Sequence, residues 1–291
     1  MRGVTRFLEA HLGRFWLAVV YLFLYAPLVF LIVFSFNSTR QDGVFTGFSL
    51  RWYQALWADT RLVEGFLLSL KVALLTGTLS VVLGAMAAFV LVRYERFRGK
   101  PLFIGLVNAP LIMPEVIIGL SLLLLMVAVQ RAVGWPERGM GTIVLGHTLL
   151  GMAYAAVVIQ ARLREVDRSI EEAAMDLGCR PAQVFFLVTL PGIAPAMVAA
   201  WLLTFTLSFD DVVISEFLSG PGVTTLPQVI FSYARRGVNP SIYAAASLLI
   251  AVVSVGIIAY SVYVARQQRQ RFTEMSAATR DERVARAKPT A

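Results

Sequence analysis

The sequence predicts an all-α polytopic membrane protein with six transmembrane helices. Of its 291 residues, 58% are hydrophobic, above the roughly 45–50% of soluble domains, and the mean hydropathy is +0.71. The apolar residues form blocks, and a helix needs about 20 of them to cross a hydrocarbon core of roughly 30 Å. The blocks lack the alternation that marks the strands of a membrane barrel. The predicted spans are residues 15–36, 66–92, 102–129, 141–161, 192–214 and 241–264.

The distribution of basic residues predicts the orientation of these spans. Most of the 26 Lys and Arg residues fall before the first span, after the second and fourth spans, and in the C-terminal tail. The positive-inside rule therefore places both termini in the cytoplasm. The net charge of +8 fits contact with anionic membrane lipids and needs no nucleic-acid partner. The predicted organisation is a cytoplasmic N-terminus 1–14, a six-span domain 15–264 with a cytoplasmic loop 165–191 and an outer loop 216–240, and a basic cytoplasmic tail 265–291.

The longest predicted cytoplasmic loop has the pattern of two short helices joined by a glycine turn. Ser169 and Glu172 have the spacing of a capping box. Gly178 is placed to end the first helix in a left-handed conformation, and Pro181 fits the first turn of a second helix, 182–190. Such a loop either lies on the bilayer or docks into a groove of a cytoplasmic partner. Its first helix carries one apolar stripe, formed by Ile170, Ala173, Ala174 and Leu177.

Part of this loop resembles the EAA motif in the permease subunits of bacterial ABC importers. The stretch EAAMDLG, residues 172–178, is followed after nine residues by VTLP, residues 188–191, with valine where the motif usually has isoleucine. The resemblance implies an ABC importer type I (MetI-like) permease fold in the bacterial inner membrane. It also implies that coupling to a cytoplasmic ATPase falls to Glu172, Ala173, Ala174 and Gly178.

Further stretches extend the resemblance over nearly the whole chain. SLKVA, residues 69–73, together with Gly84 and Arg93, is similar to the general permease pattern. Residues 106–124 and 208–244 resemble the second permease of the putrescine/spermidine importers, although importers of other solutes share parts of them. A polyamine is therefore the expected substrate, with an amino acid, thiamine, iron or a sugar derivative as alternatives. The implied partners are a second homologous permease, an ATPase dimer that uses ATP and Mg²⁺, and a periplasmic polyamine-binding protein.

A charged residue in the third predicted span is a candidate for the substrate pathway, because charge inside a membrane is costly. Glu115 follows Pro114 directly and Pro110 by just over one turn. The two prolines are expected to kink or interrupt the helix, which is tolerated where a helix lines a cavity. Glu115 is therefore expected to face a passing cation. The alternatives are a protonated carboxyl group or a partner on another subunit.

A second acidic set lies at the end of the fifth span. Asp210 and Asp211 follow Pro191 by about 30 Å of helix, which places them at the outer mouth. Adjacent helical residues point about 100° apart, so one of the two acids is expected to face the pore. Carboxylates and aromatic rings suit the ammonium groups of a diamine or triamine; the alternative is solvation with pairing to Arg235 or Arg236. The candidates are Phe209, Asp210, Asp211, Glu216 and Tyr233.

The outer loop 216–240 is expected to contain a short surface helix over residues 225–235, before Asn239 and Pro240 begin the last span. By resemblance, this region forms an outer gate that meets the periplasmic binding protein.

The sequence indicates no catalytic, cofactor or metal site. It contains no GxxxxGK[ST] phosphate loop, so ATP hydrolysis is expected in a partner subunit. His147 is expected to form hydrogen bonds between packed helices, and His11 to lie in an N-terminal loop without metal partners. Cys179 is the one cysteine, which excludes an internal disulfide. A stand-alone secondary transporter or channel and a membrane-embedded enzyme remain as the alternatives from other classes.

Overall fold

The computed structural model describes residues 2–39, 44–94, 96–235, 241–256, 258 and 261–262. Within this part of the chain the regular elements are helices, apart from one isolated bridge between Asn37 and Phe48. The helices belong to two compact units, one from residues 1–58 with 238–291 and one from residues 59–237.

The first unit contains α1 (Arg2–Ser35), α2 (Arg51–Ala58) and a helix over Ser241–Gly256. The Tyr53 hydroxyl lies 2.8 Å from the hydroxyl oxygens of both Ser35 and Ser247, and so links the three helices. The Trp52 ring nitrogen donates to the carbonyl of Asn37 at 2.7 Å. Because α1 begins at Arg2, the expected N-terminal loop around His11 was wrong, and this segment is helical. The predicted tail, 265–291, lies outside the described residues.

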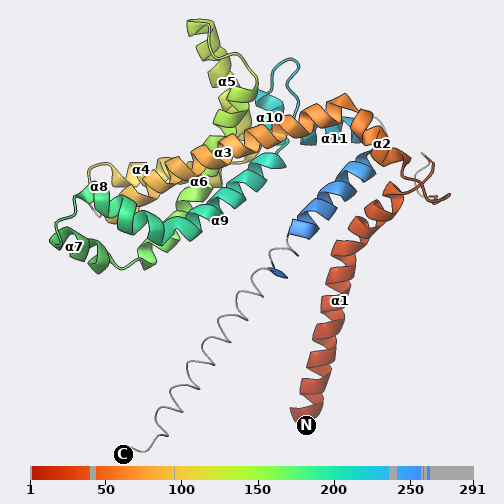
Figure 1. Cartoon of the computed structure of the whole chain (residues 1–291), viewed down its shortest axis with the longest axis horizontal. Coiled ribbons are helices and arrows are strands. Elements are labelled where there is room, and N and C mark those ends of the chain that lie inside the picture. Colours follow the sequence, from red (N-terminus) through yellow and green to blue (C-terminus); the bar gives the residue numbers. More distant parts are fainter. Residues whose placement is uncertain are drawn as a thin grey trace, which may run out of the picture. The chain divides into compact units, whose positions relative to one another are not determined.

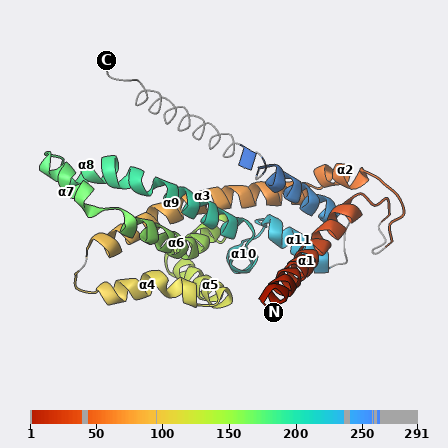
Figure 2. The same cartoon turned by 90° about the horizontal axis from the view of Figure 1, so that it is seen from below.

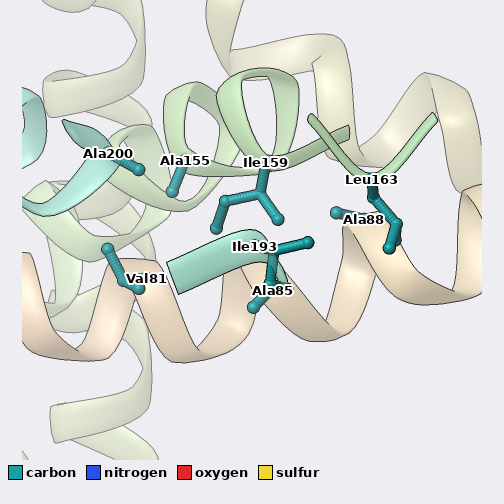
Figure 3. Close-up of a cluster of buried hydrophobic side chains, with 8 residues drawn as sticks. All are labelled: Val81, Ala85, Ala88, Ala155, Ile159, Leu163, Ile193 and Ala200. Atoms are coloured by element: carbon teal, nitrogen blue, oxygen red, sulfur yellow. The ribbon is translucent and has the colours of Figure 1, made fainter. Parts of the chain in front are cut away.

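Three long helices form the centre of the second unit: α3 (Thr60–Arg93), α6 (Met140–Glu165) and α9 (Leu190–Phe209). They lie side by side in both views (Figures 1 and 2). Small side chains at the contacts let helix backbones approach closely, as is common between membrane helices. Figure 3 shows the core cluster, formed by Val81, Ala85, Ala88, Ala155, Ile159, Leu163, Ile193 and Ala200.

The third predicted span is two helices, α4 (Lys100–Ile112) and α5 (Glu115–Val133), which run in different directions (Figure 1). Between them Met113 is extended, with ψ 137°. A proline disfavours the α conformation of the residue before it, so Pro114 causes this break. Pro110 stays inside α4. The expected interruption is therefore confirmed, and it places Glu115 at the first residue of a helix.

The fifth predicted span begins and ends at other residues than 192 and 214. Four residues of α8 (Pro181–Val184), a π-helix η1 (Phe185–Thr189) and α9 run on as one continuous helix. The expected stop of a separate short helix at residue 190 was therefore wrong. At the other end α9 stops at Phe209, and the chain turns before α10 (Val213–Leu218). The helix expected over 225–235 is confirmed as α11 (Leu226–Arg235), whereas Asn239 and Pro240 lie outside the described residues.

By length and apolar composition, five helices of the described chain can cross a membrane: Leu12–Ser35, Thr60–Arg93, Glu115–Val133, Met140–Glu165 and Pro181–Phe209. Lys100–Ile112 and Ser241–Gly256 are apolar but shorter. The number of spans and the cytoplasmic position of the termini stay predictions.

Candidate functional site

The short helix α7 (Arg168–Asp176) carries the residues expected to couple to an ATPase. Its N-cap is Asp167, whose carboxylate accepts a hydrogen bond from the backbone N–H of Ser169 at 2.9 Å. This backbone hydrogen bond lowers the pKa of Asp167. The predicted capping box of Ser169 and Glu172 was therefore wrong, because Asp167 is the N-cap and Ser169 lies inside the first turn of the helix. Glu172 is exposed, and its carboxylate lies 3.5 Å from Nε of Arg168.

The turn after α7 has the expected left-handed glycine. Gly178 has φ +90°, a region that favours glycine. Its N–H donates to the carbonyl of Met175, and the N–H of Cys179 donates to the carbonyl of Ala174. These two bonds form a Schellman motif, which satisfies carbonyls at the helix end. A Cβ atom at Gly178 would meet nothing within 4 Å, so the chain needs glycine here for its backbone conformation.

The apolar stripe of α7 faces solvent in this chain. The exposed fractions of Ile170 and Leu177 are 55% and 87%. Ala173 is exposed as well, and Ala174 is half-buried. Large apolar side chains gathered on one exposed face of a short, well-capped helix indicate a surface that another molecule or the membrane covers.

The buried residue of α7 is Glu171, which sequence reasoning did not select. Its Oε1 accepts a hydrogen bond from a guanidinium NH₂ group of Arg93 at 2.7 Å and another from the Thr189 hydroxyl at 2.7 Å. Arg93 is the last residue of α3, and Thr189 is the last residue of η1. The one sequence signal was the presence of an arginine at the end of a span and of two adjacent acids in the loop. We call Arg93, Glu171 and Thr189 the Glu171 junction.

A groove of about 280 Å³ adjoins the Glu171 junction. Its lining includes Phe89 and Tyr94 at the end of α3 and Met175 of α7. Side chains therefore do not fill the space between α7 and the end of α3.

The predicted pathway residues Glu115 and Asp211 line one small hollow of about 20 Å³, large enough for about one water molecule. His147 of α6 shares this hollow. Its Nε2 lies 3.0 Å from the Asp211 carboxylate, and its Nδ1 lies 2.7 Å from the Ser208 hydroxyl. His147 thus bonds between packed helices, as expected.

The two adjacent aspartates have different surroundings. The Asp211 carboxylate accepts hydrogen bonds from the backbone N–H groups of Ile214 at 3.3 Å and Ser215 at 2.8 Å. Asp211 therefore holds the first turn of α10 as well as bonding to His147, and its side chain is only 9% exposed. Asp210, which follows the last residue of α9, is exposed. Of the pair, Asp210 is thus the acid that remains available to a ligand.

The other pathway candidates have partners of their own. Glu216 accepts a hydrogen bond from the side-chain amide of Gln228 at 3.0 Å. The Tyr233 hydroxyl donates to the carboxylate of Asp59 at 2.9 Å. The Phe209 ring packs edge-to-face on Phe66, with centroids 6.0 Å apart.

The arginines weighed as partners for the aspartates are placed differently. The Arg235 guanidinium lies 4.3 Å from the centre of the Phe231 ring, and Arg236 is outside the described residues. Among the residues that the structure describes, no three His, Cys, Asp or Glu side chains gather as a metal site would require.

Comparison with known proteins gives the family. Residues 80–272 match the family described as binding-protein-dependent transport system inner membrane component. The chain belongs to this family. The match covers well over half of the sequence, includes α7 and the Glu171 junction, and places the protein in the inner membrane.

Relatives of this inner membrane component cover most of its length. The putrescine transport system permease protein PotI of Escherichia coli (strain K12) is 53% identical over 89% of this chain and 92% of its own. The spermidine/putrescine transport system permease protein PotC of Haemophilus influenzae is 35% identical over 86% of this chain and 94% of its own.

Solved structures of a bacterial ABC transporter that imports the acidic polysaccharide alginate share the fold. One has a TM-score of 0.65 at 15% identity and covers 89% of this chain and 98% of that chain. The other, in complex with a periplasmic protein bound to an alginate pentasaccharide, has a TM-score of 0.64 at 16% identity, covering 85% and 91%. The predicted permease fold of ABC importers is confirmed.

Proposed function

We propose that this inner membrane component is a permease subunit of an ATP-driven ABC importer for polyamines such as putrescine and spermidine. It forms half of the translocation pathway and pairs with a second, homologous permease. An ATPase dimer binds on the cytoplasmic side and a polyamine-binding protein on the periplasmic side. The chain binds no cofactor itself, since ATP and Mg²⁺ act in the ATPase. The names of PotI and PotC support the solute class.

The observation that carries the coupling role is the uncovered apolar face of α7. A helix that packs against its own chain buries its apolar stripe, whereas α7 buries Glu171 and exposes Ile170 and Leu177. The cap at Asp167 and the Schellman turn at Gly178 fix both ends of the helix. A preformed apolar helix fits a groove on a partner protein, because little ordering is needed on binding.

The side chains that remain free at the pathway suit an ammonium group. Asp210 is exposed, whereas the side chain of the adjacent Asp211 is largely buried. Glu115 is the first residue of α5 and lines the small hollow that Asp211 and His147 also line. Carboxylates form strong charge-assisted hydrogen bonds with ammonium ions, and Phe209 offers an aromatic ring nearby in the sequence. We infer that the solute passes from the periplasmic binding protein to Asp210 and then towards Glu115. Closure of the ATPases moves α7 and re-orients the pathway.

The coupling role is tested at Leu177. Leu177→Asp places a charge on the exposed face of α7 and should strongly reduce the amount of ATPase that purifies with the permease pair. Val133→Asp is the matched control, because Val133 is also exposed, at 73%, and lies at the end of α5. Wild-type recovery of the ATPase with Leu177→Asp would contradict docking through this face.

The position of α7 is tested by labelling Cys179, the one cysteine. A membrane-impermeant thiol reagent should label it only after spheroplasts are permeabilised. Labelling in intact spheroplasts would place the loop outside the cell and exclude contact with a cytoplasmic ATPase.

The solute is tested by uptake into proteoliposomes that contain the complete complex. Asp210→Asn combined with Glu115→Gln should sharply lower putrescine uptake while assembly is kept. Glu137→Gln, which removes an exposed carboxylate from the loop after α5, is the control. Unchanged putrescine uptake, or uptake of an amino acid or thiamine instead, would contradict the polyamine route.

A further inference from the structure

The Glu171 junction places a buried charge pair beneath α7. Glu171 is 8% exposed and Thr189 is 1% exposed. The side chain of Arg93 is 12% exposed. Removing charges from water is costly, and a buried ion pair persists where its geometry is good and further hydrogen bonds satisfy its atoms. Both bonds to Oε1 of Glu171 are 2.7 Å long, within the range of charge-assisted hydrogen bonds.

The Glu171 junction joins α7 to two long helices of the second unit. Arg93 ends α3, a helix of 34 residues, or about 50 Å at 1.5 Å per residue. Thr189 immediately precedes α9, a helix of 20 residues, or about 30 Å. One carboxylate oxygen therefore holds the near ends of both helices.

The far ends of these two helices carry the proposed gate and solute site. α9 ends at Phe209, directly before Asp210 and Asp211. α3 begins after Asp59, which accepts the hydrogen bond from Tyr233 of α11. A movement of α7 that is passed on through Glu171 would consequently reach Asp210 along α9 and α11 along α3.

Two local features indicate that a movement of α7 would reach α3 and α9 through the Glu171 junction and not through apolar packing. The groove of about 280 Å³ beside α7 leaves the contact incompletely packed. Thr189 lies in the π-helix η1, and π-helical turns inside α-helices are frequently found at functional sites.

We propose that Glu171 is a positioning residue that transmits the movement of α7 to α3 and α9 through Arg93 and Thr189. This inference rests on the proposed coupling role of α7. It assigns the transmission step to a residue buried behind the face that meets the ATPase. Loss of the junction should therefore separate ATP hydrolysis from transport without preventing assembly.

The test measures putrescine imported per ATP hydrolysed in proteoliposomes with the complete complex. Glu171→Gln keeps the shape of the side chain and removes its charge. It should lower the ratio at least about fivefold, the lower end of typical coupling between sites, while the ATPase still purifies with the permeases. Glu165→Gln is the control, since its bond with Arg162 at 3.0 Å is exposed and outside the junction. The Glu165→Gln complex should import as much putrescine per ATP hydrolysed as the wild type.

A charge reversal distinguishes transmission from a purely structural role. Arg93→Glu with Glu171→Arg restores an ion pair and should recover most of the ratio that each single reversal loses. If Glu171→Gln does not assemble, Thr189→Val removes one hydrogen bond with little change in volume and should lower the ratio in an assembled complex. A wild-type ratio in assembled Glu171→Gln or Thr189→Val complexes, or no recovery on reversal, overturns the proposal. Failure of the coupling role of α7 itself would appear separately, as wild-type recovery of the ATPase with Leu177→Asp.

Discussion

Replacing Gly84 with alanine is expected to weaken the packing of α3 against α6. A Cβ atom at Gly84 would lie 2.6 Å from Cβ of Ala155, 2.8 Å from the backbone nitrogen of Ala156 and 3.0 Å from the carbonyl oxygen of Met152. Two of these neighbours are backbone atoms of α6, which no side-chain rotation can move. The two helices must therefore separate to admit one methyl group.

Two contributions of opposite sign set the size of the effect. Alanine is more favourable than glycine in a helix interior by about 1 kcal/mol. Overpacking a close contact costs about 1–3 kcal/mol, and the rigid backbone neighbours favour the upper end. The net loss in free energy of unfolding is therefore about 1–2 kcal/mol. For a chain of this size that lowers Tm by about 2–8 °C.

Thermal unfolding of the purified full-length protein in detergent measures this change. Gly105→Ala in α4 is the matched control, because its Cβ would meet nothing within 4 Å. That variant should melt at the wild-type temperature or slightly above it. If Gly84→Ala is as stable as Gly105→Ala, the inference that α3 and α6 meet at Gly84 through their backbones is refuted.

Three further predictions concern the caps and hydrogen bonds of the second unit. His147→Ala leaves the Asp211 carboxylate without its buried partner and should lower the free energy of unfolding by about 3 kcal/mol in thermal or denaturant unfolding; a change below about 1 kcal/mol would contradict the pairing. Tyr233→Phe removes one hydrogen bond to Asp59, so stability should fall by about 1 kcal/mol while putrescine uptake is kept; a large loss of uptake would instead place this hydroxyl on the solute. Asp167→Ala should speed hydrogen exchange in the first turn of α7, whereas Asp167→Ser should not. The cap lowers the pKa of Asp167, so the stabilisation that the cap gives to α7 is complete above the ordinary pKa of 3.8 and is lost as pH falls below it. Hydrogen exchange in the first turn of α7, corrected for the intrinsic pH dependence of exchange, should therefore not change between about pH 7 and pH 5.

Features that depend on neighbouring residues were predictable from the sequence. Gly178 and Pro181 both take the positions expected of them, because a left-handed turn favours glycine and the first turn of a helix accepts proline. Pro114 interrupts its span for an equally local reason. The predicted capping box was wrong because Asp167 and Ser169 are both good N-cap residues and lie two residues apart. Their local sequence does not show which of them begins the helix.

The partners of the buried polar groups were not predictable in this way. Glu171 and Arg93 are 78 residues apart in the sequence, and His147 and Asp211 are 64 apart. Glu171 and Glu172 are adjacent and chemically alike, yet one is buried in an ion pair and the other is exposed. Only the packing of α7 beside α3 and η1 distinguishes them.

The amino-acid order alone was enough to establish a polytopic helical protein, the loop between its fourth and fifth spans, and its likeness to importer permeases. Apolar block length, basic-residue bias and turn chemistry depend on residue types and their order along the chain, so they can be recognised without knowing which distant segments meet. The tertiary structure decided which acid of each adjacent pair is buried, where α9 stops, and which face of α7 is left uncovered. Those outcomes depend on contacts between segments far apart in the chain, because a carboxylate is buried only where distant donors meet it.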